Sequence, residues 1–226
     1  MIATNSVRTT PQSFSAGNNN FEIINSFTYL GSTVTSDNST RDEIDRRIMA
    51  ANRCFYALQK QLRSKLLRRN TKILLYKTLI KPVLTYASET WVMTKQTEGS
   101  IATFERRILR TIYGPVRDHN GWRRRYNREL YDIYAEPDVI SSIKVGRLRW
   151  AGHVIRMDDD NPIKRLTLST SQGRRRPGRP KMRWMDSVNA DAAVLGVGNW
   201  KIKARDRQEW RRLLDSAKAH PGLSSL

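Results

Sequence analysis

Apolar residues recur at intervals of three and four along most of this chain, and this period constrains its fold more than any other feature. Between residues 40 and 63 the pattern places one apolar stripe on one face of a helix, made of Ile44, Ile48, Ala51, Phe55, Leu58 and Leu62. Thr40 and Glu43 have the spacing of a capping box, in which each side chain satisfies a free backbone N–H. The sequence therefore predicts a mainly helical protein.

The same period predicts two further helices in the first half of the chain. Asn70 is placed to cap a helix over residues 73–80, whose residues are apolar almost all round and therefore expected to be central. Pro82 should kink or restart that helix, because proline has no N–H to donate. A third helix is expected over residues 100–113.

Three more helices are expected in the second half. Pro137 suits the first turn of one that runs through residue 154. Near the C terminus, one helix should carry Trp184 and another should carry both Trp200 and Trp210. Most tryptophans lie on apolar stripes, so we expect Trp150, Trp184 and Trp210 to pack in the interior.

The ends of the helical segments suggest an order of regions along the chain. Residues 5–20 are polar and are expected to form a loop, and residues 21–31 are β-branched and aromatic, which predicts one or two short strands. The expected regions are a loop and β segment over 1–32, a helical bundle over 33–115, a basic helical region over 116–166, a basic flexible linker over 167–180 and C-terminal helices over 181–226.

The charge of the chain points to a polyanionic partner. The formal net charge is +20 and the isoelectric point is about 10.7. An anionic membrane surface is the rival, but no apolar run approaches the roughly 20 residues of a spanning helix, so no membrane partner is expected. Cys54 is the only cysteine and no signal peptide is visible, so a nuclear or cytoplasmic location is expected rather than secretion.

Cations off the apolar stripes, or in runs with tryptophan and glycine, are the candidate nucleic-acid-binding residues. Cations neutralise phosphates, and flat aromatic rings stack on unpaired bases. The candidates are Arg106, Arg107, Arg110, Trp122, Arg123, Arg124, Arg125, Arg147, Arg149, Arg174, Arg175, Arg176, Arg179, Lys181 and Arg183.

Two of these groups allow a second interpretation. The run 122–126 either stacks bases and holds phosphates, or contains a core tryptophan beside a solvated arginine face. Residues 177–181 resemble an AT-hook, the narrow arm that enters A·T minor grooves, although Pro177 stands where the hook has arginine. The alternative is a basic linker held near nucleic acid by charge alone.

No catalytic residue or metal site is expected within this sequence. Asp158, Asp159 and Asp160 are adjacent, whereas metal-dependent phosphoryl transfer needs carboxylates that converge from separate elements. One cysteine and three scattered histidines cannot form a zinc finger, and no phosphate-binding glycine loop is present. A metal-dependent nuclease built on these aspartates is the enzymatic alternative, and His153 is expected to be structural.

Several blocks, in order, resemble the C-terminal part of non-LTR (LINE-type) retrotransposon endonuclease–reverse transcriptases. Tyr29-Leu30-Gly31 is similar to the segment that closes the palm of these polymerases. The other similar blocks include Arg46-Arg47-Ile48 and Glu89-Thr90-Trp91, and the longer ones lie at 75–86, 104–110, 122–127 and 146–153.

The resemblance implies specific roles. Tyr29, Leu30 and Gly31 would correspond to the primer-grip region, the following helices to the thumb that holds template–primer duplex, and the basic tail to a region that holds RNA or target DNA. The family's catalytic aspartates lie upstream, in a Tyr/Phe-x-Asp-Asp turn that does not occur here. We therefore expect a catalytically silent fragment that binds RNA and DNA, with Mg²⁺ and the palm, fingers and endonuclease belonging to a longer parent. A domesticated DNA-binding architectural protein is the other alternative.

Overall fold

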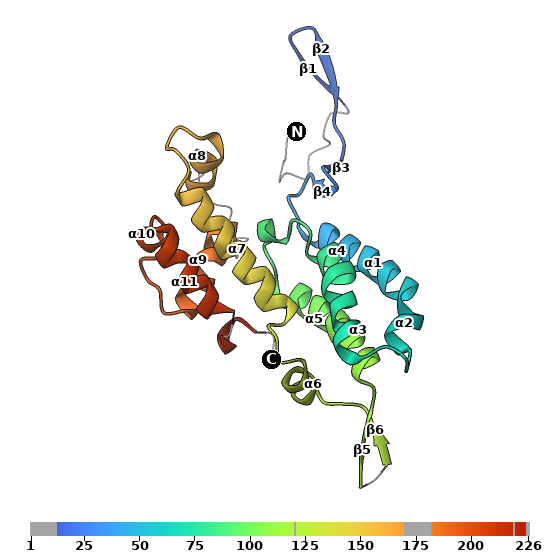
Figure 1. Cartoon of the computed structure of the whole chain (residues 1–226). Coiled ribbons are helices and arrows are strands. Elements are labelled where there is room, and N and C mark those ends of the chain that lie inside the picture. Colours follow the sequence, from blue (N-terminus) through green and yellow to red (C-terminus); the bar gives the residue numbers. More distant parts are fainter. Residues whose placement is uncertain (1–12, 120, 170–181, 219, 225–226) are drawn as a thin grey trace.

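The computed structural model describes residues 13–119, 121–169, 182–218 and 220–224, and within these ranges the chain is mainly helical, as predicted (Figure 1). The helices are α1 Arg41–Ala57, α2 Gln59–Arg63, α3 Arg69–Leu75, the π-helical turn η1 Tyr76–Ile80, α4 Lys81–Thr85, the 3-10 turn η2 Ser88–Thr90, α5 Lys95–Tyr113, α6 Asn127–Tyr134, α7 Val139–Ile155, α8 Pro162–Leu168, α9 Trp184–Val194, α10 Trp200–Lys203, α11 Arg207–Ala217 and the 3-10 turn η3 Pro221–Leu223.

The described strands form separate antiparallel hairpins. They are β1 Ser13–Ala16 with β2 Asn19–Glu22, β3 Ser26–Tyr29 with β4 Ser32–Thr35, and β5 Val116–Asp118 with β6 Gly121–Arg123. Leu30 and Gly31 both have positive φ, which matches the two-residue turns that close β-hairpins. The expected strands over 21–31 are present, but β1 lies where a loop was expected, and the β5–β6 hairpin was not predicted.

The predicted capping box at the start of α1 is wrong, because both of its side chains form tertiary contacts instead. The Thr40 hydroxyl donates to the Val92 carbonyl at 2.9 Å. The Glu43 carboxylate accepts from the Thr33 amide at 2.7 Å and pairs with Arg46 and Arg47. These bonds connect α1 to the segment after η2 and to the β3–β4 hairpin.

Other helix boundaries also differ from prediction. Arg68, not Asn70, is the residue that precedes α3. Helix α5 starts at Lys95, five residues before the expected start at residue 100, because Thr94 and Thr97 form reciprocal hydrogen bonds at its N terminus. Asp138 caps α7 by accepting from the Ser141 amide at 2.7 Å.

The predicted restart at Pro82 is confirmed. Proline cannot donate to the carbonyl four residues back, and the chain forms the π-helical turn η1 just before α4.

The buried apolar residues form two clusters that meet along α7. The first joins α1, α2, η1, α4, α5 and α6 to the start of α7, and ends there at Ile143. The second starts at Val145 and packs the rest of α7 against α9, α10 and α11. Trp200 and Trp210 both lie in this cluster, on two helices rather than the expected one. Gly152 allows α11 to approach α7, because a Cβ there would overlap the Trp210 indole.

Glu105, on α5, is a fully buried carboxylate that connects four elements of the first cluster. Its oxygens accept from the Tyr76 hydroxyl at 2.7 Å, the Tyr131 hydroxyl at 3.0 Å and the Val139 amide at 3.0 Å. Burial raises the pKa of Glu105, and the Val139 amide together with the nearby Lys81 opposes that rise. The three donors belong to η1, α6 and α7, so this one side chain fixes all three elements against α5.

Replacing Glu105 should therefore destabilise the fold strongly. Glu105→Ala leaves two buried hydroxyls and one buried amide without their acceptor, at about 1–3 kcal/mol for each group. We expect the free energy of unfolding, measured by urea titration, to fall by about 3 kcal/mol or more. The control is Glu136→Ala, which removes a surface ion pair with Lys77 and should cost less than about 1 kcal/mol. A loss of under about 1 kcal/mol for Glu105→Ala would contradict this account.

The two N-terminal hairpins differ in how they attach to the helices. Figure 1 shows β1 and β2 projecting from the helical body, and their Phe14 and Phe21 rings stack on each other with centroids 5.1 Å apart. The β3–β4 hairpin is bonded to Glu43 and Tyr86 of the helical body. Burial opposes the ionisation of Glu43, but the Thr33 amide and then Arg47 and Arg46 outweigh it and lower the pKa of Glu43.

Hydrogen exchange should distinguish the two hairpins. An isolated pair of strands is marginal in water, so β1–β2 amides should exchange faster than β3–β4 amides. Glu43→Gln should remove most of that difference. Because folding lowers the pKa of Glu43, its ionised carboxylate stabilises the folded state at pH values above the ordinary pKa of 4.5. This stabilisation is lost as the pH falls through the lower pKa of the folded state. Equal exchange in both hairpins of the unaltered protein would show that this anchor is ineffective.

Candidate nucleic-acid interface

The C-terminal end of α5 turns into the β5–β6 hairpin, and Arg123 holds that hairpin to α6. Its guanidinium lies 2.8 Å from the Asp118 carboxylate and 2.6 Å from the Glu129 carboxylate, and it also stacks over the Tyr126 ring at 4.5 Å. The bond from Arg123, with the Tyr126 amide, lowers the pKa of Glu129 to about 2. Two carboxylates therefore balance the charge of Arg123, which leaves less of that charge for the predicted phosphate contact than in its unpaired neighbours.

A hollow of about 390 Å³ lies between the end of α5 and this hairpin. Its lining is strongly basic and consists of Arg107, Arg110, Gly114, Pro115, Trp122, Arg123, Arg124 and Arg125. These residues are up to 18 positions apart in the sequence. The β5–β6 hairpin reverses the chain direction and so brings Trp122 and the residues after it close to Arg107 and Arg110 at the end of α5.

Most of the arginines around the hollow bond only to uncharged acceptors. Arg110 donates to the Arg125 carbonyl at 3.3 Å and to the Asn127 amide oxygen at 2.6 Å, and Arg125 donates to the Gly114 carbonyl at 3.1 Å. In the part of the chain that the structure describes, no carboxylate forms an ion pair with these two or with Arg107 and Arg124. Their positive charges are therefore available to an anion.

These charges also repel one another. Burial, followed by the nearby charges of Arg124 and Arg106, lowers the pKa of Arg110. A phosphate in the hollow would relieve that repulsion and accept charge-assisted hydrogen bonds. Arg106 itself is half-buried and donates to the Thr103 hydroxyl at 3.0 Å.

Trp122 is 72% exposed, which excludes the interpretation that it packs in the core. It lies on β6, opposite Arg117 in the hairpin register, and forms part of the wall of the hollow. The run 122–126 thus presents an aromatic face beside unneutralised cations, the arrangement that the base-stacking interpretation requires.

The predicted role of Arg147 is wrong in this structure. Arg147 is only 3% exposed and pairs with Asp191 of α9 at 2.8 Å, so it connects α7 to α9 inside the protein. Its Nε and second Nη have no hydrogen-bond partner. Burial raises the pKa of Asp191, and Arg147 opposes that rise. Arg149, two residues later, is exposed on α7 but is not part of the hollow.

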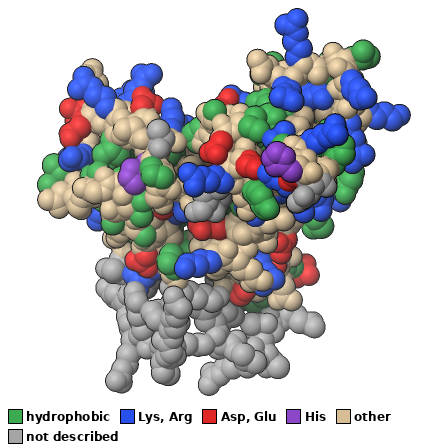
Figure 2. Space-filling model, turned by 90° about the horizontal axis from the view of Figure 1, so that it is seen from below, with side chains coloured by type: hydrophobic (Ala, Val, Ile, Leu, Met, Phe, Trp, Pro, Cys, Tyr) green, Lys and Arg blue, Asp and Glu red, His purple; other side chains and the backbone are tan. Residues whose placement is uncertain are grey.

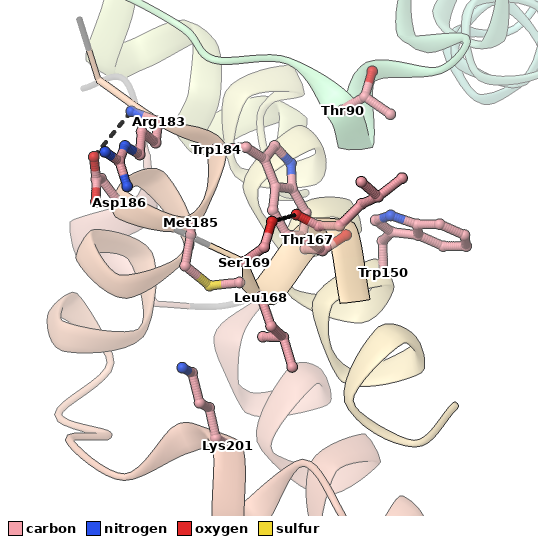
Figure 3. A pocket seen from close by; sticks show the side chains of 11 residues that line it. Thr90, Trp150, Thr167, Leu168, Ser169, Arg183, Trp184, Met185, Asp186 and Lys201 are labelled. Atoms are coloured by element: carbon pink, nitrogen blue, oxygen red, sulfur yellow. Dashed lines mark hydrogen bonds between the residues drawn. The ribbon is translucent and has the colours of Figure 1, made fainter. Parts of the chain in front are cut away.

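A second hollow, of about 570 Å³, lies among η2, α7, α8 and α9 (Figure 3). Trp150, Trp184 and the predicted Arg183 line it. Both tryptophans are half-buried rather than internal as expected, and the Trp184 indole donates to the Glu89 carbonyl at 2.7 Å. The predicted internal packing holds for Trp210. The remaining candidates of the basic segment lie outside the described residues; they are Arg174, Arg175, Arg176, Arg179 and Lys181.

The primer-grip-like residues form the tip of the β3–β4 hairpin. The Leu30 carbonyl accepts from the Tyr86 hydroxyl at 2.8 Å, and the Gly31 carbonyl accepts from Arg47 at 2.5 Å. The side chains of Tyr29 and Leu30 are exposed. Figure 1 shows this hairpin and β5–β6 near opposite ends of the helical body, so the two predicted groups do not form one site.

Sequence reasoning missed the exposed cations between Arg53 and Lys77, which run from the end of α1 through α2 and α3 to η1. No acidic residue occurs between Asp45 and Glu89, and this absence could have identified the segment. Its exposed cations are Arg53, Lys60, Arg63, Lys65, Arg68, Arg69 and Lys77. Figure 2, which views the molecule from below, shows Lys and Arg side chains gathered toward the upper right with few acidic side chains among them.

The described residues give no support to a metal site or a membrane span. Asp158, Asp159 and Asp160 are all exposed, and Asp159 pairs with Lys164 at 2.7 Å. Nowhere in the described ranges do three His, Cys, Asp or Glu side chains come together as metal ligands would. None of the described helices combines the length and apolarity that crossing a bilayer requires.

Comparison with known proteins finds a transposon-derived protein of Caenorhabditis elegans that is 27% identical over 198 residues, which cover 83% of this chain and 69% of that protein. The chain is thus distantly related to a transposon-derived protein. No family model matches the chain. No solved structure matches it either.

The exposure of Trp122 predicts that removing its ring leaves the fold intact. Trp122→Ala should change the free energy of unfolding by less than about 0.5 kcal/mol, as for a surface substitution. Trp210→Ala should cost about 3–5 kcal/mol, because that ring is 2% exposed and its indole donates to the Leu148 carbonyl. Thermal melts of both variants test this pair. Comparable losses of stability in the two variants would show that the Trp122 ring packs in the core.

Proposed function

We propose that this chain is the nucleic-acid-binding, C-terminal part of a transposon-derived reverse transcriptase, and that it binds RNA and DNA. The observation that carries the proposal is the hollow where Arg107, Arg110, Arg124 and Arg125, free of carboxylate partners in the described chain, surround the exposed Trp122. The relationship to a transposon-derived protein supports the same context, and so does the ordered resemblance to LINE-type polyproteins.

We further propose that the chain does not transfer nucleotides by itself. Two-metal nucleotidyl transfer needs carboxylates that converge, and the Tyr/Phe-x-Asp-Asp turn does not occur in these 226 residues. In this proposal the Mg²⁺ ions and the catalytic aspartates belong to a palm outside this sequence. The nuclease alternative gains no support from the exposed, adjacent Asp158, Asp159 and Asp160.

Neutralising the hollow should weaken binding to all nucleic acids. In the variant Arg107→Gln, Arg110→Gln, Arg124→Gln, each lost phosphate contact removes about 0.9 from the slope of log affinity against log salt on duplex DNA, so the slope should flatten by roughly 2 to 3. Fluorescence anisotropy with labelled oligonucleotides at several salt concentrations measures both quantities.

The matched control removes three exposed arginines elsewhere, Arg205→Gln, Arg211→Gln, Arg212→Gln. Both variants lose the same net charge, so a general electrostatic effect would weaken binding equally in the two. We expect the hollow variant to lose at least tenfold more affinity than the control. Equal losses would place the binding surface elsewhere.

A further inference from the structure

We infer that the hollow is one end of a track for single-stranded nucleic acid, which continues over α1 and α2 and uses Trp122 and Tyr56 as two stacking platforms. This inference rests on the proposed function, and it names the form of nucleic acid that the same basic surface prefers.

A direct contact connects the hollow to α1. Arg107, which lines the hollow, donates to the Asn52 amide oxygen of α1 at 3.2 Å. Helix α5 also packs against both α1 and α2. Arg107 therefore connects the basic hollow beside the β5–β6 hairpin to the surface of α1, and α2 lies next to it.

Beyond Asn52, the track follows one helical face. Backbone bonds from Leu58 to the Cys54 carbonyl and from Leu62 to the Leu58 carbonyl carry the helical period from α1 into α2. Asn52, Tyr56, Lys60 and Arg63 are separated by steps of four, four and three residues, which places them along one face. This face belongs to the segment without acidic residues, and neither Lys60 nor Arg63 forms an ion pair in the described chain.

Both rings are largely exposed to solvent. Tyr56 is 59% exposed and Trp122 is 72% exposed. Trp122 lies beside the arginines of the hollow, and Tyr56 shares its helical face with Lys60 and Arg63. Tyr126, by contrast, is exposed but its ring is covered by the Arg123 guanidinium at 4.5 Å, so it is less available to a base. Exposed aromatic faces that alternate with cations are the pattern of proteins that bind single strands.

The rings favour a single strand over a duplex on physical grounds. In a duplex the bases are already stacked inside, and the surface offers mainly phosphates that need only the cations. An unpaired base can stack on Trp122 or Tyr56, and each such contact contributes about 1–3 kcal/mol. The volume of the hollow, about 390 Å³, lies within the usual range of small-ligand sites, about 300–1,000 Å³.

The test uses the full chain with four single substitutions, Trp122→Ala, Tyr56→Ala, Trp122→Phe and Tyr56→Phe. Anisotropy titrations would compare a labelled single-stranded oligonucleotide of mixed sequence with the same sequence as a DNA duplex and as an RNA–DNA hybrid. We expect each alanine variant to lose about 5- to 150-fold in single-strand affinity and less than about twofold on either duplex. The phenylalanine variants, which keep a ring, should recover most of the loss.

Leu166→Ala, which removes an exposed apolar side chain from α8, is the control for loss of surface area alone. Thermal melts would verify that every variant is folded, as the exposure of both rings predicts. Ultraviolet cross-linking to a single strand, followed by peptide mapping, should place adducts at Trp122 and Tyr56.

Equal losses on single strands and duplexes, or no loss on either, would overturn the single-strand track. If the arginine variant of the previous subsection weakens binding while the ring variants do not, the proposed function stands and this inference fails. If neither set of variants weakens binding, both fail. Loss confined to Trp122→Ala would overturn the continuation over α1 and α2 and leave a single stacking site in the hollow.

Discussion

The architecture of the first cluster depends on one buried carboxylate. Glu105 accepts hydrogen bonds from η1, α6 and α7 at once, and a carboxyl group in the interior is tolerable only when such donors surround it. Because it fixes α6 against α5, it also positions Glu129, the residue that holds Arg123 and the β5–β6 hairpin. The geometry of the hollow is thus set by a contact made in the interior.

The distribution of acidic residues explains how a chain with a net charge of +20 forms a compact core and still leaves cations free. The buried or half-buried carboxylates have structural partners: Glu43 holds a hairpin, Asp191 pairs with Arg147, and Glu129 neutralises Arg123. Each of these acids is used within the fold. No described carboxylate pairs with Arg53 on α1, with Lys60 and Arg63 on α2, or with Arg107, Arg110, Arg124 and Arg125 around the hollow. These unpaired charges suit a polyanion better than an acidic peptide of few charges.

Particular residues show where sequence reasoning succeeded and where it failed. The apolar stripes located α1, α5 and α7, because a period of three and four residues has one main structural solution. The capping box at Thr40 and Glu43 was wrong because long-range partners, Val92 and Thr33, displaced the local bonds. The β5–β6 hairpin was missed because its strands are only three residues long and its stability comes from the ion pairs of Arg123.

By itself, the sequence determined the helical class, the excess of positive charge and the concentration of arginine near residues 106–125, since these follow from composition and period. Only the tertiary structure decided which arginines face solvent. Arg147 and Arg149 are two residues apart on one helix, yet one is buried against Asp191 and the other is exposed. That difference depends on where α9 packs, and a charge becomes available to a ligand only when no neighbouring element supplies its counter-charge.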